Sequence, residues 1–121
     1  MFVVTSNKST RLLFLIYIGR IRLEELTSHR EDIRAVLAEL SAGFRVLADF
    51  THLDSMDPDC LPEIGRMMDL LGQTGTEMVV RVIPDPRKDP GMNILTAFHY
   101  SKNSRVLTSS SLMEAVNVLS L

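Results

Sequence analysis

The chain has 121 residues, the usual length of one domain, and its hydrophobic share of 45% and charged share of 23% are those of an ordinary globular protein. We therefore expect a single domain over residues 1–121 and exclude a disordered or fibrous chain. The net charge is −2 and the basic residues are scattered, which excludes the basic stripe that a nucleic-acid partner requires. The single cysteine, Cys60, cannot form an internal disulfide, which favours a reducing, cytoplasmic location.

Two β-rich runs open the chain. Residues 2–5 and 11–18 are rich in β-branched and aromatic residues, and the polar residues 6–9 between them are typical of a hairpin turn. The second run ends at Gly19-Arg20, far short of the roughly 20 apolar residues that a membrane-spanning helix needs. Charges follow this run rather than precede it, unlike those of a signal peptide. The sequence predicts an antiparallel hairpin and no membrane span.

A helix and a buried strand come next. From Leu23 to Leu40, apolar residues recur at steps of three and four while acidic residues occupy the other faces, which is the periodicity of an amphipathic helix. Gly43 is expected to end this helix. Residues 44–50 are almost all apolar, which indicates a central parallel strand covered on both faces.

The second helix is predicted to start at Asp57. An aspartate is a good N-cap, and Pro58 would take the first helical position, where its missing N–H costs nothing. The helix is expected to fade at residues 72–75. Its inward-facing residues are predicted to be Leu61, Ile64, Met68 and Leu71.

The last third of the chain adds two strands and two helices. The predicted segments are, in order, a strand over 77–83, a proline-rich loop over 84–90, a short helix around 94–98 and a strand over 105–108. Ser111 followed by Glu114 is a capping-box pattern that predicts a final helix. The order is therefore β-β-α-β-α-β-α-β-α, an α/β fold in which helices wrap a mixed sheet.

Four carboxylates lie around the junction of the central strand and the second helix, a place where open α/β sheets put their binding surfaces. They are Asp49, Asp54, Asp57 and Asp59. Their spacing lacks the alternating series, the turn glycine and the closing glutamate of a calcium loop. We expect no metal and no cofactor here.

An enzyme is one alternative. A cysteine in the first turn of a helix can have a lowered thiol pKa, and His52 lies close to Cys60 in the sequence. Cysteine is more often a small buried hydrophobic residue, so we expect no catalytic residue.

The element order and the acidic segment resemble the STAS family, the sulfate transporter and anti-sigma factor antagonist domains, over nearly the whole chain. The family typically has a strand followed by Met-Asp-Ser-Ser-Gly-Leu, and residues 55–61, Ser-Met-Asp-Pro-Asp-Cys-Leu, lie at that place. The Met, Asp and Leu are kept, whereas Pro58, Asp59 and Cys60 stand where the family has Ser, Ser and Gly. Asp59 therefore matches the serine that the family phosphorylates.

The resemblance implies a non-enzymatic regulatory domain whose partner is an anti-sigma-factor-like or other regulatory protein. In the family, phosphorylation weakens binding to an ATP-binding anti-sigma kinase. A phosphoserine brings nearly two negative charges to a helix N-terminus, and Asp59 brings one permanently. We therefore expect no switching by phosphorylation at this position, although acids are favoured in the first turn of any helix. Modification of Ser55 or Thr51 stays open.

The predicted partner-binding residues surround this junction. They are Ser55, Asp57, Pro58, Asp59, Glu63 and Arg66. The alternative function is a small hydrophobic-ligand or lipid carrier, because STAS-like sheets resemble the CRAL-TRIO architecture and the seven methionines can line an adaptable pocket. That alternative predicts an internal apolar cavity. The opening hairpin also offers an edge strand for a weak homodimer.

Overall fold

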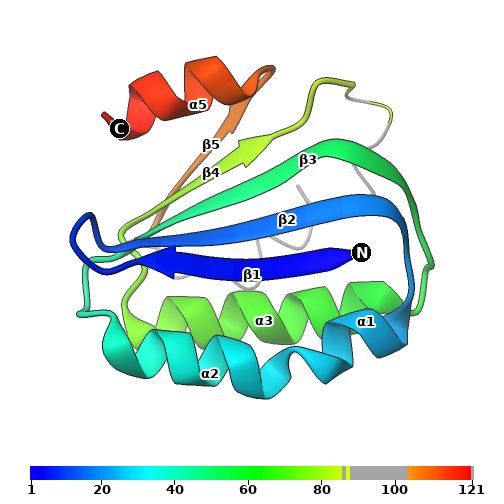
Figure 1. The fold of residues 1–121 in the computed structure, drawn as a ribbon, viewed down its shortest axis with the longest axis horizontal. Helices are drawn as coiled ribbons and strands as arrows, with labels where there is room; N and C mark the ends of the chain where they lie inside the picture. Colours follow the sequence, from blue (N-terminus) through cyan, green and yellow to red (C-terminus); the bar gives the residue numbers. More distant parts are fainter. Residues whose placement is uncertain (86, 88–103, 121) are drawn as a thin grey trace.

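The structure, a computed structural model, describes residues 1–85, 87 and 104–120 (Figure 1). Within them the elements are β1 (Phe2–Asn7), β2 (Leu12–Ile21), α1 (Leu23–Ser28), α2 (Arg30–Glu39), β3 (Arg45–Met56), α3 (Cys60–Thr74), β4 (Met78–Val82), β5 (Arg105–Ser109) and α5 (Leu112–Leu119). The short helix expected around 94–98 and most of the loop expected over 84–90 lie outside the described residues.

The strands form one sheet in the order β1-β2-β3-β4-β5. β1 and β2 are antiparallel, and each later pair of neighbours is parallel, which confirms the predicted mixed sheet. In the hairpin turn, Asn7 Oδ1 accepts hydrogen bonds from the Ser9 hydroxyl at 2.7 Å and from the Thr10 N–H at 3.2 Å. The Asn7 side chain thus satisfies the Thr10 N–H, a backbone group of the turn.

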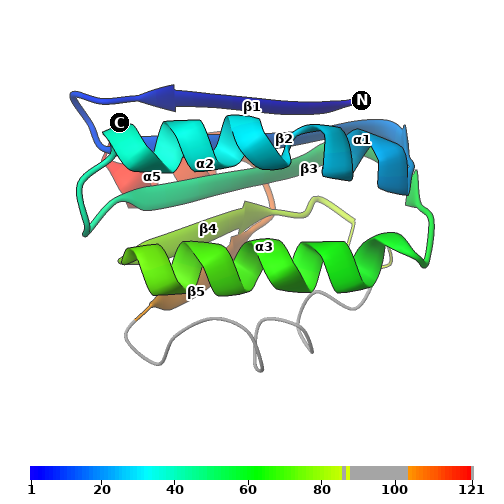
Figure 2. The same cartoon turned by 90° about the horizontal axis from the view of Figure 1, so that it is seen from below.

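Helices cover both faces of the sheet. α1, α2 and α3 lie on one face and α5 lies on the other (Figures 1 and 2). Side chains alternate along β3, so Val46 and Ala48 join the larger core beneath α1–α3 while Leu47 joins the smaller core beneath α5. The helix residues buried in the larger core are Leu26, Ile33, Leu37, Cys60, Ile64, Met68 and Leu71. The apolar run that predicted a strand covered on both faces is confirmed.

The predicted first helix is divided at His29. The Ser28 hydroxyl donates to the Glu25 carbonyl at 2.9 Å, and His29 Nδ1 lies 2.7 Å from the same oxygen. Such local bonds compete with the helical hydrogen-bond pattern, which is why one helix becomes two. The prediction that Gly43 ends this segment was also wrong, because α2 ends at Glu39 and Gly43 lies in the following turn with a φ of 89°.

The junction between β3 and α3 differs from its prediction in two ways. β3 continues to Met56 instead of ending at Phe50, because its last residues pair with the end of β2, where Ile21 faces Met56. The acidic segment is therefore partly strand. α3 starts at Cys60, so the prediction of Asp57 as its N-cap was wrong.

Candidate functional site

The predicted partner surface lies where β3 leads into α3. We call residues 54–59 the acidic corner. It stands at one end of the sheet, beside the end of β2 (Figure 1). The corner residues that are exposed are Asp54, Ser55, Pro58 and Asp59.

Asp57, the half-buried aspartate of the corner, is held by β2. Arg20 donates from Nε and Nη2 to the two carboxylate oxygens of Asp57, at 2.9 and 3.1 Å. The Asp57 N–H donates to the Ile21 carbonyl at 3.0 Å. The hydrogen bonds and charge of Asp57 raise the pKa of Arg20. This forked arrangement fixes the orientation of both groups and neutralises one charge of the corner.

Asp59 is the residue directly before the first turn of α3. Its backbone is helical, with φ −70° and ψ −9°, and its side chain accepts no capping hydrogen bond. The first turn is instead closed by the Cys60 N–H, which donates to the Asp57 carbonyl at 2.9 Å. The Asp59 carboxylate is therefore an exposed charge near a helix N-terminus, where the helix dipole favours it by about 0.3–1 kcal/mol.

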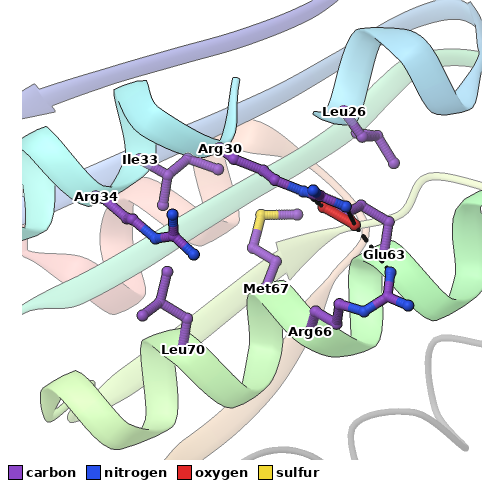
Figure 3. Close-up of a pocket in the computed structure, with 8 residues that line it drawn as sticks. All are labelled: Leu26, Arg30, Ile33, Arg34, Glu63, Arg66, Met67 and Leu70. Atoms are coloured by element: carbon purple, nitrogen blue, oxygen red, sulfur yellow. Dashed lines mark hydrogen bonds and ion pairs between the residues drawn. The ribbon is translucent and has the colours of Figure 1, made fainter. Parts of the chain in front are cut away.

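Glu63 and Arg66 lie one turn further along α3. The Glu63 side chain is 6% exposed, and Arg30 of α2 donates to its carboxylate from Nε at 2.5 Å and from Nη2 at 2.7 Å (Figure 3). Arg66 Nη1 donates to the same carboxylate at 3.1 Å. The hydrogen bond from Arg30 lowers the pKa of Glu63 most, burial opposes this, and Arg66 adds to the lowering. Glu63 thus links α2 to α3.

Of the three arginines that hold these carboxylates, the sequence pointed to Arg66 but not to Arg20 or Arg30. Arg20 is 37 residues from Asp57, and Arg30 is 33 residues from Glu63. No periodicity or local motif reports a pair that far apart in the chain. The structure brings Ser55, Pro58 and Asp59 together at the corner but places Glu63 and Arg66 in a separate groove.

This groove, the arginine groove, runs between α1–α2 and α3 and has a volume of about 420 Å³ (Figure 3). It is lined by Leu26, Arg30, Ile33, Arg34, Glu63, Arg66, Met67 and Leu70. The apolar side chains contribute to its floor, whereas the arginines come from both flanking helices.

The geometry gives Cys60 no nucleophilic role. The residue is fully buried, and its thiol donates to the Ile21 carbonyl at 3.6 Å. Burial, with smaller contributions from Asp59 and Asp57, raises the thiol pKa to about 11. The thiol is therefore protonated near neutral pH, whereas nucleophilic cysteines react as thiolates. His52 is an exposed residue of β3.

Within the described residues, one small cavity bears on the carrier alternative. Between the sheet and α3, a cavity of about 20 Å³ is lined by residues that include Tyr17, Phe50 and Met68. A cavity of this size holds about one water molecule, whereas small-molecule sites are usually about 300–1,000 Å³. This cavity therefore gives no support to the internal ligand site that the carrier alternative predicts. In the part of the chain that the structure describes, no three metal-ligating side chains cluster, and no helix has the length and apolar character to cross a membrane.

No family model matches the sequence, and no curated protein matches it. Solved structures do. An uncharacterized protein of the DUF3478 family from Shewanella loihica PV-4, described as having a SpoIIAA-like fold, is 12% identical with a TM-score of 0.73, over 98% of this chain and 92% of that one. The anti-sigma factor antagonist SpoIIAA in its unphosphorylated form is 15% identical with a TM-score of 0.63, over 99% and 98% of the two chains.

A third similar structure is an anti-sigma factor antagonist from Mycobacterium paratuberculosis, which is 15% identical with a TM-score of 0.61, over 100% of this chain and 94% of that one. The likeness in each case extends over nearly the whole of both chains. This chain therefore has the SpoIIAA-like, STAS-like α/β fold that the element order predicted.

Proposed function

We propose that this protein is a non-enzymatic regulatory domain that binds a protein partner through the acidic corner and the adjoining exposed face of α3. The observation that carries the proposal is the environment of Asp59. Its carboxylate is exposed at the start of α3 and accepts no capping hydrogen bond, so its charge faces solvent. The solved structures with this fold include anti-sigma factor antagonists, which supports a regulatory partner of the anti-sigma-factor type.

The negative charge of this surface is built into the chain. At the position that matches the family's phosphorylatable serine, an aspartate carries about one charge, whereas a phosphoserine carries about 1.5–2 at neutral pH. Arg20 neutralises Asp57, so Asp59 and Asp54 supply the exposed charge of the corner. In the proposed domain the charge at Asp59 is therefore not added by a kinase, and the domain is not switched there by phosphorylation.

The proposal also covers location and self-association. Cys60 is a free, buried thiol, which suits a reducing cytoplasm. β1 lies at the edge of the sheet and pairs with β2 alone among the described strands, so its outer backbone groups can pair with a second copy in a weak homodimer.

The proposal is tested by reversing the charge of Asp59. Tagged wild-type protein and the variants Asp59→Lys and Asp59→Asn are expressed in the native host, and the proteins that copurify are measured by quantitative mass spectrometry. We expect at least one partner to fall about tenfold with Asp59→Lys and less with Asp59→Asn, because charge reversal adds repulsion while neutralisation removes attraction.

The matched control is Glu77→Lys. Glu77 is exposed just before β4, and its N–H donates to the Phe44 carbonyl, so it lies at the end of the sheet away from the corner. Glu77→Lys changes the net charge by the same amount as Asp59→Lys and should retain the partner. Identical partners for wild type and Asp59→Lys would contradict the proposal.

A further inference from the structure

The arginine groove is an open depression that the described side chains do not fill. The groove has a volume of about 420 Å³, whereas the cavity beneath α3 has a volume of about 20 Å³. The core beneath α3 is therefore well packed, and the groove is open. On its floor, Leu26 and Ile33 are almost fully buried, while Met67 and Leu70 are half-buried. Apolar surface of this kind gains free energy when a partner covers it.

The positively charged side chains that line the groove outnumber the negatively charged ones. Arg30 and Arg66 share one carboxylate, that of Glu63. Arg34 pairs with Glu31, whose side chain is 82% exposed, and an exposed pair of this type is weak. The side chains of the three arginines are 49–67% exposed, so they can reach a bound molecule.

The spacing of the lining residues follows the helices. Arg30 and Arg34 are one turn apart on α2, and Arg66 and Leu70 are one turn apart on α3. The groove therefore presents an apolar strip with arginines on both flanks, as Figure 3 shows. A helix with an apolar stripe bordered on each side by acidic residues has the complementary pattern.

We propose that the arginine groove binds an acidic amphipathic helix of a protein partner. Apolar side chains of that helix cover Ile33, Met67 and Leu70, and its carboxylates pair with Arg34 and Arg66. The inference rests on the proposed function in taking a protein as partner, but the acidic corner contributes none of the lining residues. An open groove suits a helix better than a small molecule, because small-molecule sites usually enclose most of their ligand.

The test uses the purified full chain and two synthetic peptides. The first is a labelled helical peptide of about 16 residues, with leucine along one stripe and glutamate on both sides of it. The second has lysine in place of each glutamate. Binding is measured by fluorescence anisotropy. We expect the glutamate peptide to bind more tightly than the lysine peptide, and its affinity to fall as salt is raised.

Arg34→Glu is the variant that tests the site, since Arg34 pairs with Glu31 and lies outside the Arg30–Glu63–Arg66 group. It should weaken binding of the glutamate peptide by about tenfold, whereas Arg105→Glu, an equal charge change at an exposed position of β5, should not. Circular dichroism checks that both variants are folded, and Arg34→Gln, with a smaller expected loss, replaces Arg34→Glu if that variant does not fold.

Three results would overturn the inference: equal binding of the two peptides, equal effects of the groove and control variants, or tighter binding of decanoate than of the glutamate peptide. The last would mark the groove as a site for a small anionic amphiphile. Because the measurement uses purified components, its outcome is independent of whether Asp59→Lys loses a cellular partner.

Discussion

At the scale of single residues, Glu63 is the buried acid on which two arginines converge. Its side chain is 6% exposed, while the Arg30 and Arg66 side chains are 49% and 67% exposed. The carboxylate is almost fully buried but accepts three N–H bonds, and the arginine side chains stay about half exposed or more. Removing the acid therefore costs less than breaking a fully buried ion pair but more than removing a surface one.

We predict that Glu63→Gln lowers the free energy of unfolding by about 1.5–3 kcal/mol at pH 7, the usual range for hydrogen bonds to charged groups. Folding lowers the pKa of Glu63 below its ordinary value of 4.5, so this stabilisation is complete above that pH. It is lost as the pH falls through the lower pKa of the folded state. Urea unfolding of wild type and variant from pH 7 to pH 2 measures the difference.

The matched control for this prediction is Glu31→Gln, which removes an 82% exposed acid from its pair with Arg34. It should change the free energy of unfolding by less than about 0.5 kcal/mol. A stability gap between wild type and Glu63→Gln that stays constant down to pH 2 would show that the charge of Glu63 contributes nothing.

At the scale of elements, the end of α3 is set by one glycine. Gly75 has a φ of 105°, which is the left-handed conformation that closes a helix, and its carbonyl accepts a hydrogen bond from the Gly43 N–H at 2.8 Å. The sequence predicted that α3 would fade over residues 72–75, and it ends at Thr74. The turn after α3 thus packs directly on the turn after α2.

We predict that Gly75→Ala lowers the free energy of unfolding by about 1–2 kcal/mol from the left-handed backbone, with an added loss from crowding. A Cβ at this position would lie 3.0 Å from the Cβ of Ala42. Gly19→Ala is the matched control, because Gly19 has a φ of 71° but nothing lies within 4 Å of its added Cβ. Chemical denaturation should show the larger loss for Gly75→Ala, and equal losses would rule out the contact with Ala42.

At the scale of the whole molecule, one sheet supports two cores. β3 contributes Val46 to the core beneath α1–α3 and Leu47 to the core beneath α5. α5 is joined to β3 by Leu119, which is fully buried and whose carbonyl accepts a hydrogen bond from Arg45 Nη1 at 2.5 Å. Neither core can lose its packing without disturbing the strand that both share, so we expect the domain to unfold as a unit.

We predict that Leu119→Ala lowers the free energy of unfolding by about 2–4 kcal/mol through loss of burial and the cavity it leaves. Tyr17 stacks on Phe50 in the other core, with ring centroids 4.5 Å apart, so its fluorescence reports on a region that Leu119 does not touch. In a Tyr100→Phe background, Tyr17 fluorescence and far-ultraviolet circular dichroism should shift to the same lower midpoint. Separate midpoints would mean that the two cores unfold independently.

The sequence predicted those parts of the fold that short windows of residues encode. Polar turn residues after β1 and the apolar run of β3 predicted a hairpin and a strand covered on both faces, and both are present. Ser111 accepts a hydrogen bond from the Glu114 N–H at 3.2 Å, which confirms the predicted cap of α5. Glu114 itself pairs with the Ser110 hydroxyl, so half of the predicted capping box is formed.

Part of the candidate site could also be predicted from the sequence. Acidic and small polar residues directly after an apolar strand predicted an exposed junction, and Ser55, Pro58 and Asp59 are exposed there. The exposure of these residues agrees with the pattern, while their role in binding stays a prediction. The burial of Glu63 was not visible, because a glutamate in the first turn of a helix is normally a solvated residue.

The tertiary structure alone decided the contacts between residues that are distant in sequence. Because it pairs with β2, β3 continues to Met56 through residues of low strand propensity. The Asp57 carboxylate binds Arg20 instead of capping the helix as predicted. Arg30 similarly draws Glu63 into the groove between α2 and α3. Periodicity and capping depend on residues within one or two helical turns of each other, so the sequence determines the elements and their order. Ion pairs and strand ends depend on which elements come to lie side by side, and that is settled when the sheet and helices pack.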